Sequence, residues 1–242
     1  MTLAIHLYRR MMRRGRVIAL VSLSSVPGLV YWLGVFDADS GEAAGLYSEI
    51  VSAVGYTFVI AALILTAATL REEKDAGTLP YIYMRPISRP WFAAQSIIAG
   101  SVAAIVIGIG GWLATVLASI AVGNGLGPTL PALSLFVAAA IGYAAVFVPL
   151  GYLAPRSLLI GLGYIIVWET ILANVVTGLA QFSIWRIALS IYAGIEDDFG
   201  QVASDTLGPV TPGVGGGVAK LAAVVLIGLG ALIWTLRRRD AL

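Results

Sequence analysis

The sequence contains no cysteine and a single histidine, His6, among its 242 residues. The absence of cysteine excludes disulfides, thiol chemistry and cysteine-ligated metal sites. One histidine near the N-terminus also argues against a histidine-based catalytic or metal site. Charged residues make up only 12% of the chain, roughly half the fraction found in soluble domains. The low content of cysteine, histidine and charged residues argues against a soluble enzyme and favours a protein embedded in the lipid bilayer.

Apolar residues dominate what is present. They account for 59% of the sequence and form unbroken runs of about twenty residues, the length that crosses a bilayer as a helix. The sequence therefore predicts an all-α, polytopic membrane protein with a single transmembrane domain over residues 1–242. We expect an extracytoplasmic region between the last two spans, at residues 180–217, whose first part is a helix. The six predicted spans are residues 17–36, 49–70, 91–122, 132–153, 157–178 and 218–236.

The N-terminal segment, residues 1–15, combines a basic cluster with apolar residues at helical spacing. Leu3, Leu7 and Met11 recur every four residues. This pattern predicts an amphipathic helix at the membrane interface, with its arginines facing lipid phosphates. We expect the segment to be retained, because no small-residue cleavage site follows it. It either serves only as a basic anchor that sets orientation or has a specific docking role.

The distribution of lysine and arginine predicts the topology. Six spans place both termini on one side, and 13 of the 15 basic residues fall on that side. Since basic residues concentrate in cytoplasmic loops, we expect cytoplasmic termini in a multi-pass protein of the plasma membrane. The sorting also means that the net charge of +2 gives no indication of nucleic-acid binding. The exceptions are Arg186 and Lys220, and the thirteen are Arg9, Arg10, Arg13, Arg14, Arg16, Arg71, Lys74, Arg85, Arg89, Arg156, Arg237, Arg238 and Arg239.

The segment of residues 71–89 is the longest polar interruption on the basic side, and it encloses a short apolar stretch at residues 79–84. Gly77 allows the chain to leave the second span at an unusual backbone angle. Thr78 is suited to cap a short helix, Pro86 to end it, and Ser88 to cap the third span with Pro90 at its first position. The sequence predicts a rigid helical elbow between two membrane helices.

At these residues the chain resembles the membrane subunit, or permease, of ABC transporters of the type-2, exporter-like class. The resemblance is carried by Glu72-Glu73, Gly77-Thr78, the apolar residues 79–84 and the segment Arg85-Pro86-Ile87-Ser88-Arg89. It extends to the amphipathic N-terminus, the six spans, the pair Trp168-Glu169 and the basic ending at residues 237–240. One departure is Gln95, since many members carry a basic residue in the first turns of the third span.

The resemblance implies a transporter subunit that is not itself an enzyme. Two permease copies, or two related permeases, form the path for a hydrophobic or amphipathic cargo. Separate cytoplasmic ATPase subunits, which bind ATP and Mg²⁺, dock on the elbow, called the coupling helix in this family. The chain itself needs no cofactor or metal. The residues expected to couple to the ATPase are Arg71, Glu72, Glu73, Gly77, Thr78, Leu79, Tyr81, Ile82, Met84, Arg85, Ser88 and Arg89.

Glu169 is the one acidic residue deep within a predicted span. A charge at that depth costs on the order of 2.5–3.5 kcal/mol on insertion scales, so its side chain should face protein or water or be protonated. It either makes a hydrogen bond between spans, to Tyr, Ser or Thr, or acts in the substrate path or its gating. If the second and fifth spans face the partner permease, as in the family, Tyr56, Phe58 and Trp168 line a central cavity with it.

Two other functions compete with an ATP-driven exporter. A secondary carrier driven by an ion gradient usually has inverted repeats and broken helices around polar midplane residues, and the sequence shows no convincing repeat. The second is a non-transporting membrane scaffold bound to an ATPase, which only a transport assay distinguishes from an exporter. An intramembrane enzyme fits least, because paired acids are absent from the spans.

Overall fold

The computed structural model describes residues 3–35, 40–77, 88–127, 129–175, 178–195 and 213–238. Every regular element within these residues is helical, as the sequence predicts. The elements are α1 Leu3–Met11, α2 Arg14–Ser24, α3 Val26–Gly34, α4 Ser40–Val54, α5 Tyr56–Asp75, α7 Arg89–Ala121, α8 Thr129–Leu153, α9 Ser157–Gly163, the π-helix η1 Tyr164–Leu172, α10 Ala173–Val175, the 3₁₀ turn η2 Ala180–Phe182, α11 Ile184–Ala193 and α13 Val214–Arg238.

Five helical stretches of the described residues are long and apolar enough to cross a membrane. They correspond to the first four and the last of the six predicted spans, so the six-span count is not confirmed. The fifth predicted span, residues 157–178, is the exception, because its apolar helix Ser157–Leu172 is shorter than the other five. The third span, α7, has 33 residues and bears out the prediction of an unusually long helix.

The first two spans are each divided into two helices. α2 and α3 meet at Ser25, whose hydroxyl donates a hydrogen bond to the carbonyl of Val21 at 2.7 Å, and Pro27 stands in the first turn of α3. α4 and α5 meet at Gly55, where a Cβ atom would lie 2.5 Å from the indole ring of Trp185. α4 begins at Ser40, so the expectation of an outer loop as far as residue 48 is wrong.

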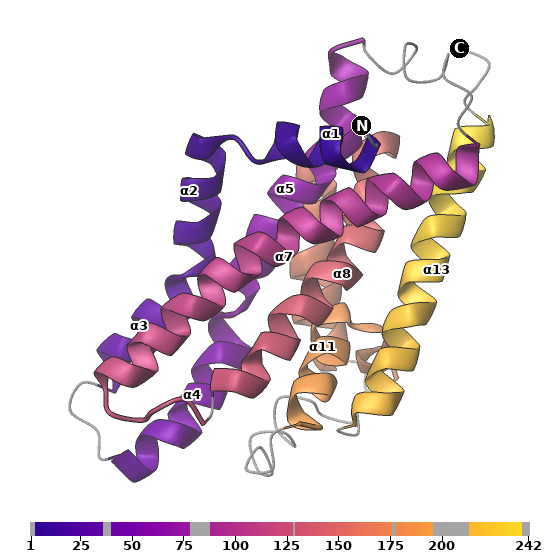
Figure 1. Ribbon diagram of the computed structural model, residues 1–242. Coiled ribbons are helices and arrows are strands. Elements are labelled where there is room, and N and C mark those ends of the chain that lie inside the picture. The colour runs from indigo at the N-terminus through magenta and orange to yellow at the C-terminus, as the bar shows by residue number, and fades with distance from the viewer. Residues whose placement is uncertain are drawn as a thin grey trace.

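α8 lies in the middle of the bundle, where it packs against α5, α7, α11 and α13 (Figure 1). Glycines bring the backbones together at two of these contacts. A Cβ at Gly151 would lie 2.1 Å from the carbonyl oxygen of Ala67 in α5, and one at Gly228 of α13 would lie 2.1 Å from that of Ala145. Close approach over small residues is the usual basis of helix packing in membranes.

The bundle has two distinct ends. We call the end that holds α1 and the last turns of α5, α8 and α13 the arginine end (Figure 1). Leu7 and Met11 of α1 belong to the same buried cluster there as Leu232 and Leu236 of α13. The first and last described helices therefore contribute to one buried cluster at the same end of the molecule.

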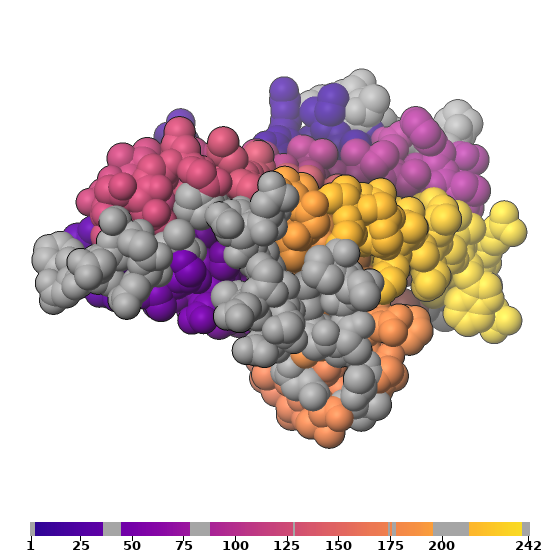
Figure 2. Space-filling model, turned by 90° about the horizontal axis from the view of Figure 1, so that it is seen from below, coloured from indigo at the N-terminus to yellow at the C-terminus, as the bar shows by residue number. Residues whose placement is uncertain are grey.

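Two consecutive pieces carry the chain from the arginine end to the opposite end after α8. The first, α9 with η1 and α10, forms a ridge that stands out from the bundle when the molecule is seen from the opposite end (Figure 2). The second is α11, all ten residues of which are buried. Its last turn reaches the start of α13, because the N–H of Gly213 bonds the carbonyl of Ser190 at 3.0 Å. The helix predicted near residues 181–193 is thus present, packed inside the bundle.

Candidate functional site

The acidic pair Glu72 and Glu73 closes α5 at the arginine end, and arginines from the N-terminal helices hold it. Arg10 Nη1 lies 2.8 Å from Glu73 Oε1, and Arg10 Nη2 donates to the backbone carbonyl of Glu72 at 3.1 Å. Arg16 bonds the carboxylate of Glu72. The side chain of Glu73 is only 1% exposed, so its charge depends on these partners. We refer to Arg10, Arg16, Glu72 and Glu73 as the polar clamp.

The polar clamp corrects the prediction that the N-terminal arginines face lipid phosphates. Arg10 and Arg16 face the acidic pair, whereas Arg9, Arg13 and Arg14 are exposed. The N-terminal helix is therefore fastened to the rest of the protein as well as basic on its surface.

His6 belongs to the same neighbourhood. Its Nε2 lies 3.4 Å from Glu73 Oε1, and its side chain is 57% exposed. The one histidine of the chain thus has an acidic partner at the arginine end.

The first turn of α1 is held by Gln95 of α7. The N–H of Ala4 donates to the side-chain oxygen of Gln95 at 3.1 Å. The first N–H groups of a helix have no partner within the helix, so this oxygen supplies one. A basic side chain at position 95 would have no acceptor to offer to this N–H group.

The last turn of α5 is also tied to α8. Arg71 Nη1 donates to the carbonyl of Ala154 at 3.0 Å, and its Nε donates to Asp75 at 2.7 Å. Lys74 lies over the ring of Tyr152, with its Nζ 5.5 Å from the ring centroid. The end of α5 is thus joined to α1 and α2 on one side and to α8 on the other.

The elbow predicted after α5 is described only at its two edges. Gly77 has φ of +67°, the left-handed conformation that glycine adopts without strain and that the sequence predicts. Ser88 occupies the N-cap of α7 but makes no capping bond with its side chain, and helix α7 begins at Arg89, so Pro90 is its second residue. The remaining predicted coupling residues lie outside the described part of the chain: Thr78, Leu79, Tyr81, Ile82, Met84 and Arg85.

Glu169 holds the N-terminus of the buried helix α11. Its Oε1 accepts hydrogen bonds from the N–H of Ile184 at 3.0 Å and from the hydroxyl of Tyr164 at 3.3 Å. Its Oε2 accepts one from the hydroxyl of Ser183, which in turn caps α11 by accepting the N–H of Arg186 at 3.1 Å. The helix terminus adds partial positive charge, so the carboxylate is satisfied by dipoles. Glu169 thus bonds a tyrosine and a serine, but these lie in η1 itself and at the start of α11 rather than in another predicted span.

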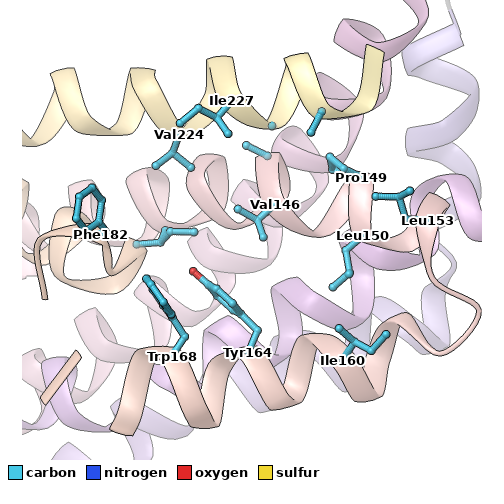
Figure 3. A pocket seen from close by; sticks show the side chains of 14 residues that line it. Val146, Pro149, Leu150, Leu153, Ile160, Tyr164, Trp168, Phe182, Val224 and Ile227 are labelled. Atoms are coloured by element: carbon cyan, nitrogen blue, oxygen red, sulfur yellow. The ribbon is translucent and has the colours of Figure 1, made fainter. Parts of the chain in front are cut away.

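A cavity of about 520 Å³ lies between η1, α8 and α13. Tyr164 and Trp168 point into it from η1, toward Val224 and Ile227 of α13 (Figure 3). Glu169 is not among the lining residues and is fully buried. The cavity is almost entirely apolar and suits a hydrocarbon group.

The structure separates the other two residues predicted in the path. Phe58 is fully buried, and its ring packs edge-on against Phe136 at 5.3 Å between centroids. Tyr56 is half-buried, with its ring 5.0 Å from that of Trp185. Within one subunit, Trp168 alone of the four predicted path residues lines the cavity, and the path between two subunits stays a prediction.

Sequence reasoning missed Arg10, Arg16, Gln95 and Ser183 as partners of the predicted residues. The first two had a signal, because unbalanced arginines beside a buried span need counter-charges. The hydroxyl of Ser183 before the apolar run Ile184–Ala193 fits an N-cap. Nothing in the sequence pointed to Gln95 as a cap for a helix some 90 residues away.

Comparison with known families adds one finding. The model of a family described as ABC-2 family transporter protein matches residues 11–167, more than half of the chain. The match contains Arg16, Glu72 and Glu73 but ends two residues before Glu169. No curated protein matches the chain.

Proposed function

Since the chain belongs to the ABC-2 family of transporter membrane subunits, we propose that it is the permease of an ATP-driven exporter. Two permease subunits form the path, and separate ATPase subunits, which bind ATP and Mg²⁺, dock on residues 71–89. The cargo is hydrophobic or amphipathic. The arginine end faces the cytoplasm, in accord with the distribution of basic residues, and the membrane is the plasma membrane.

The polar clamp is the observation that carries this proposal. Residues 78–87 follow α5 directly, and the last turn of α5 bonds α1 and α2 through Glu73 and Glu72. The same turn bonds the end of α8 through Arg71. A force applied to the segment after α5 therefore reaches four helices together. This mechanical linkage is what a subunit driven from outside requires.

The absence of native cysteine makes docking directly testable. The variant Met84→Cys, carrying the only thiol of the permease, is co-purified with its ATPase and treated with a short bifunctional maleimide. We expect a crosslink to the ATPase at position 84. The control Leu117→Cys, on a 67% exposed side chain of α7, should give none.

Coupling is measured in proteoliposomes as the rate of ATP hydrolysis by the ATPase alone and by the ATPase bound to the permease. We expect the permease to change the hydrolysis rate of its ATPase and Arg10→Met to reduce that change. The proposal is contradicted if no position in residues 78–89 crosslinks to the ATPase, or if the permease does not change the rate of ATP hydrolysis. ATP-dependent movement of an amphipathic dye distinguishes an exporter from a scaffold.

A further inference from the structure

A second hollow lies at the arginine end, between the last turns of α5 and the turn that joins α8 to α9. Its volume is about 370 Å³. We call it the α5–α9 cleft and define it by Ile64, Arg71 and Asp75 on one wall and Arg156, Leu158 and Leu159 on the other. The family match assigns no role to it, and the coupling proposal involves only its α5 wall, through residues 71–75.

The cleft changes from apolar to charged along its length. Ile64, Arg71 and Asp75 share one face of α5, because they are spaced by seven and four residues. Eleven residues separate Ile64 from Asp75, which corresponds to roughly 16 Å of helix. That length is close to half of the ~30 Å hydrocarbon core of a bilayer. Leu158 and Leu159, 49% and 66% exposed, continue the apolar part on the second wall.

The charged part presents one cation and one anion. Arg156 is exposed, and its guanidinium makes no hydrogen bond or ion pair within the described part of the chain. Asp75 pairs with Arg71 through Oδ2, but its side chain is 58% exposed, and a carboxylate has further acceptor sites. Glu72, also in the cleft, is already held by Arg16. A ligand in the cleft therefore meets a carboxylate with unused acceptor sites on one wall and an unpaired guanidinium on the other.

We propose that the α5–α9 cleft binds a zwitterionic phospholipid with a primary ammonium headgroup, such as phosphatidylethanolamine. Arg156 holds the phosphate, Asp75 accepts from the ammonium, and one acyl chain follows Leu158, Leu159 and Ile64 into the bilayer. A purely anionic headgroup has no cation for the unused acceptor sites of Asp75, and a choline headgroup has no N–H to donate. The bound lipid bridges the end of α5 and the α8–α9 turn at the point where Arg71 already joins them.

The test uses the purified full-length chain without an ATPase, so it is independent of transport. Native mass spectrometry measures binding of dioleoyl phosphatidylethanolamine, phosphatidylcholine and phosphatidylglycerol in detergent. One added charge-assisted hydrogen bond corresponds to about tenfold in affinity, so we expect the ethanolamine lipid to bind about tenfold more tightly than the choline lipid. Equal binding of these two, or tightest binding of the glycerol lipid, overturns the proposal.

Two variants separate the two charges. Arg156→Gln should weaken the ethanolamine and choline lipids alike, because both carry the phosphate. Asp75→Asn keeps an acceptor for Arg71 and should abolish only the difference between the two lipids. The control Arg237→Gln removes an exposed arginine at the same end and should change neither. A preference that survives Asp75→Asn contradicts the assignment of the ammonium.

A third variant tests the apolar part without touching charge. Leu159→Trp adds bulk to an exposed side chain at the base of the cleft, so it should reduce adducts of all three lipids. Unfolding midpoints of each variant show that the protein remains folded. Unchanged adducts in Leu159→Trp place the acyl chain elsewhere and defeat the proposal.

Discussion

Glu73 and Glu169 are both fully buried carboxylates, and they are satisfied by partners of different kinds. Glu73, at the arginine end, is paired with the guanidinium of Arg10 and lies near His6. Glu169, within the bundle, receives hydroxyl and backbone N–H donors at the start of α11. One site balances charge with charge, and the other balances charge with dipoles.

The difference follows from depth. Arg10 keeps 26% of its side chain exposed, so it neutralises Glu73 while its own charge remains partly hydrated. A guanidinium brought to the depth of Glu169 loses that hydration, at a cost of several kcal/mol. Donors at a helix N-terminus are fixed by the fold and carry no full charge, so they stabilise the acid without a second desolvated ion.

The two sites also differ in reach along the sequence. The polar clamp joins residues 56 to 63 positions apart, whereas Glu169 binds residues 14 and 15 positions ahead. The clamp therefore fixes the relative positions of α1, α2 and α5 at the arginine end. Glu169 fixes a local turn between η1 and α11.

The largest effect on this comparison should come from Arg10→Met. Methionine keeps much of the packing volume but leaves the carboxylate of Glu73 buried without its guanidinium. Breaking a buried pair in this way costs about 3 kcal/mol, or a fall of about 6–12 °C in Tm for a protein of this size. Tryptophan fluorescence of the detergent-purified protein during heating measures the change.

Arg16→Met is the matched variant within the polar clamp. Its partner Glu72 is 26% exposed, and one guanidinium nitrogen of Arg16, Nη1, is buried without a partner in the described chain. We therefore expect a cost of about 1 kcal/mol or less. Equal losses in Arg10→Met and Arg16→Met would show that burial does not distinguish the two pairs.

An effect smaller than that of Arg10→Met but larger than that of Arg16→Met is expected from Glu169→Ala. The change leaves the hydroxyl of Ser183 and the N–H of Ile184 without their acceptor, which costs about 2 kcal/mol. Glu169→Gln retains one acceptor oxygen and should lose less. Thermal unfolding gives the order, and hydrogen exchange at α11 shows whether the loss is local.

These two variants also decide what Glu169 does. If Glu169→Gln transports and unfolds as the unchanged protein does, the acid is a packing element and its charge is dispensable. Normal stability with altered transport or ATPase stimulation instead assigns it to the path.

An effect about as small as that of Arg16→Met should come from Gln95→Lys, which places a basic residue near the start of α7. It removes the acceptor for the N–H of Ala4 and places a cation at a helix N-terminus, at a cost of about 1 kcal/mol. Gln95→Glu retains an acceptor and adds a favourable charge, so it should be neutral or stabilising. Proteolysis near the N-terminus reports the release of α1, and a stabilising effect of Gln95→Lys would contradict the capping role.

Hydropathy predicted five spans well because they are long, continuous runs of apolar residues. The span predicted at residues 157–178 is not confirmed, because its apolar helix is short, is π-helical at Tyr164–Leu172 and is followed by the 3₁₀ turn η2. Averaged hydropathy measures how apolar a segment is, but it does not predict the turn after η1. That turn depends on the hydrogen bond between Glu169 and Ser183. The near-uniform burial of α11 was visible in its apolar sequence, in which Arg186 and Ser190 are the main interruptions.

The candidate site shows the same limit. The acidic pair and Gly77 were identified from local chemistry, and the structure gives Gly77 the predicted backbone angle. The partners Arg10 and Gln95 depend on how α1 lies across α5 and α7, which no local pattern encodes. The coupling helix itself, at residues 78–87, remains a prediction.

The hydrogen bond between Glu169 and Ser183 has a consequence for how these two positions evolve. Each side chain is fully buried, and each completes the bonding of the other and of the same helix start. Replacing either one alone strands a polar group in the bilayer, so the neutral evolutionary route is a paired replacement. Across descendants of this chain, positions 169 and 183 should therefore change together.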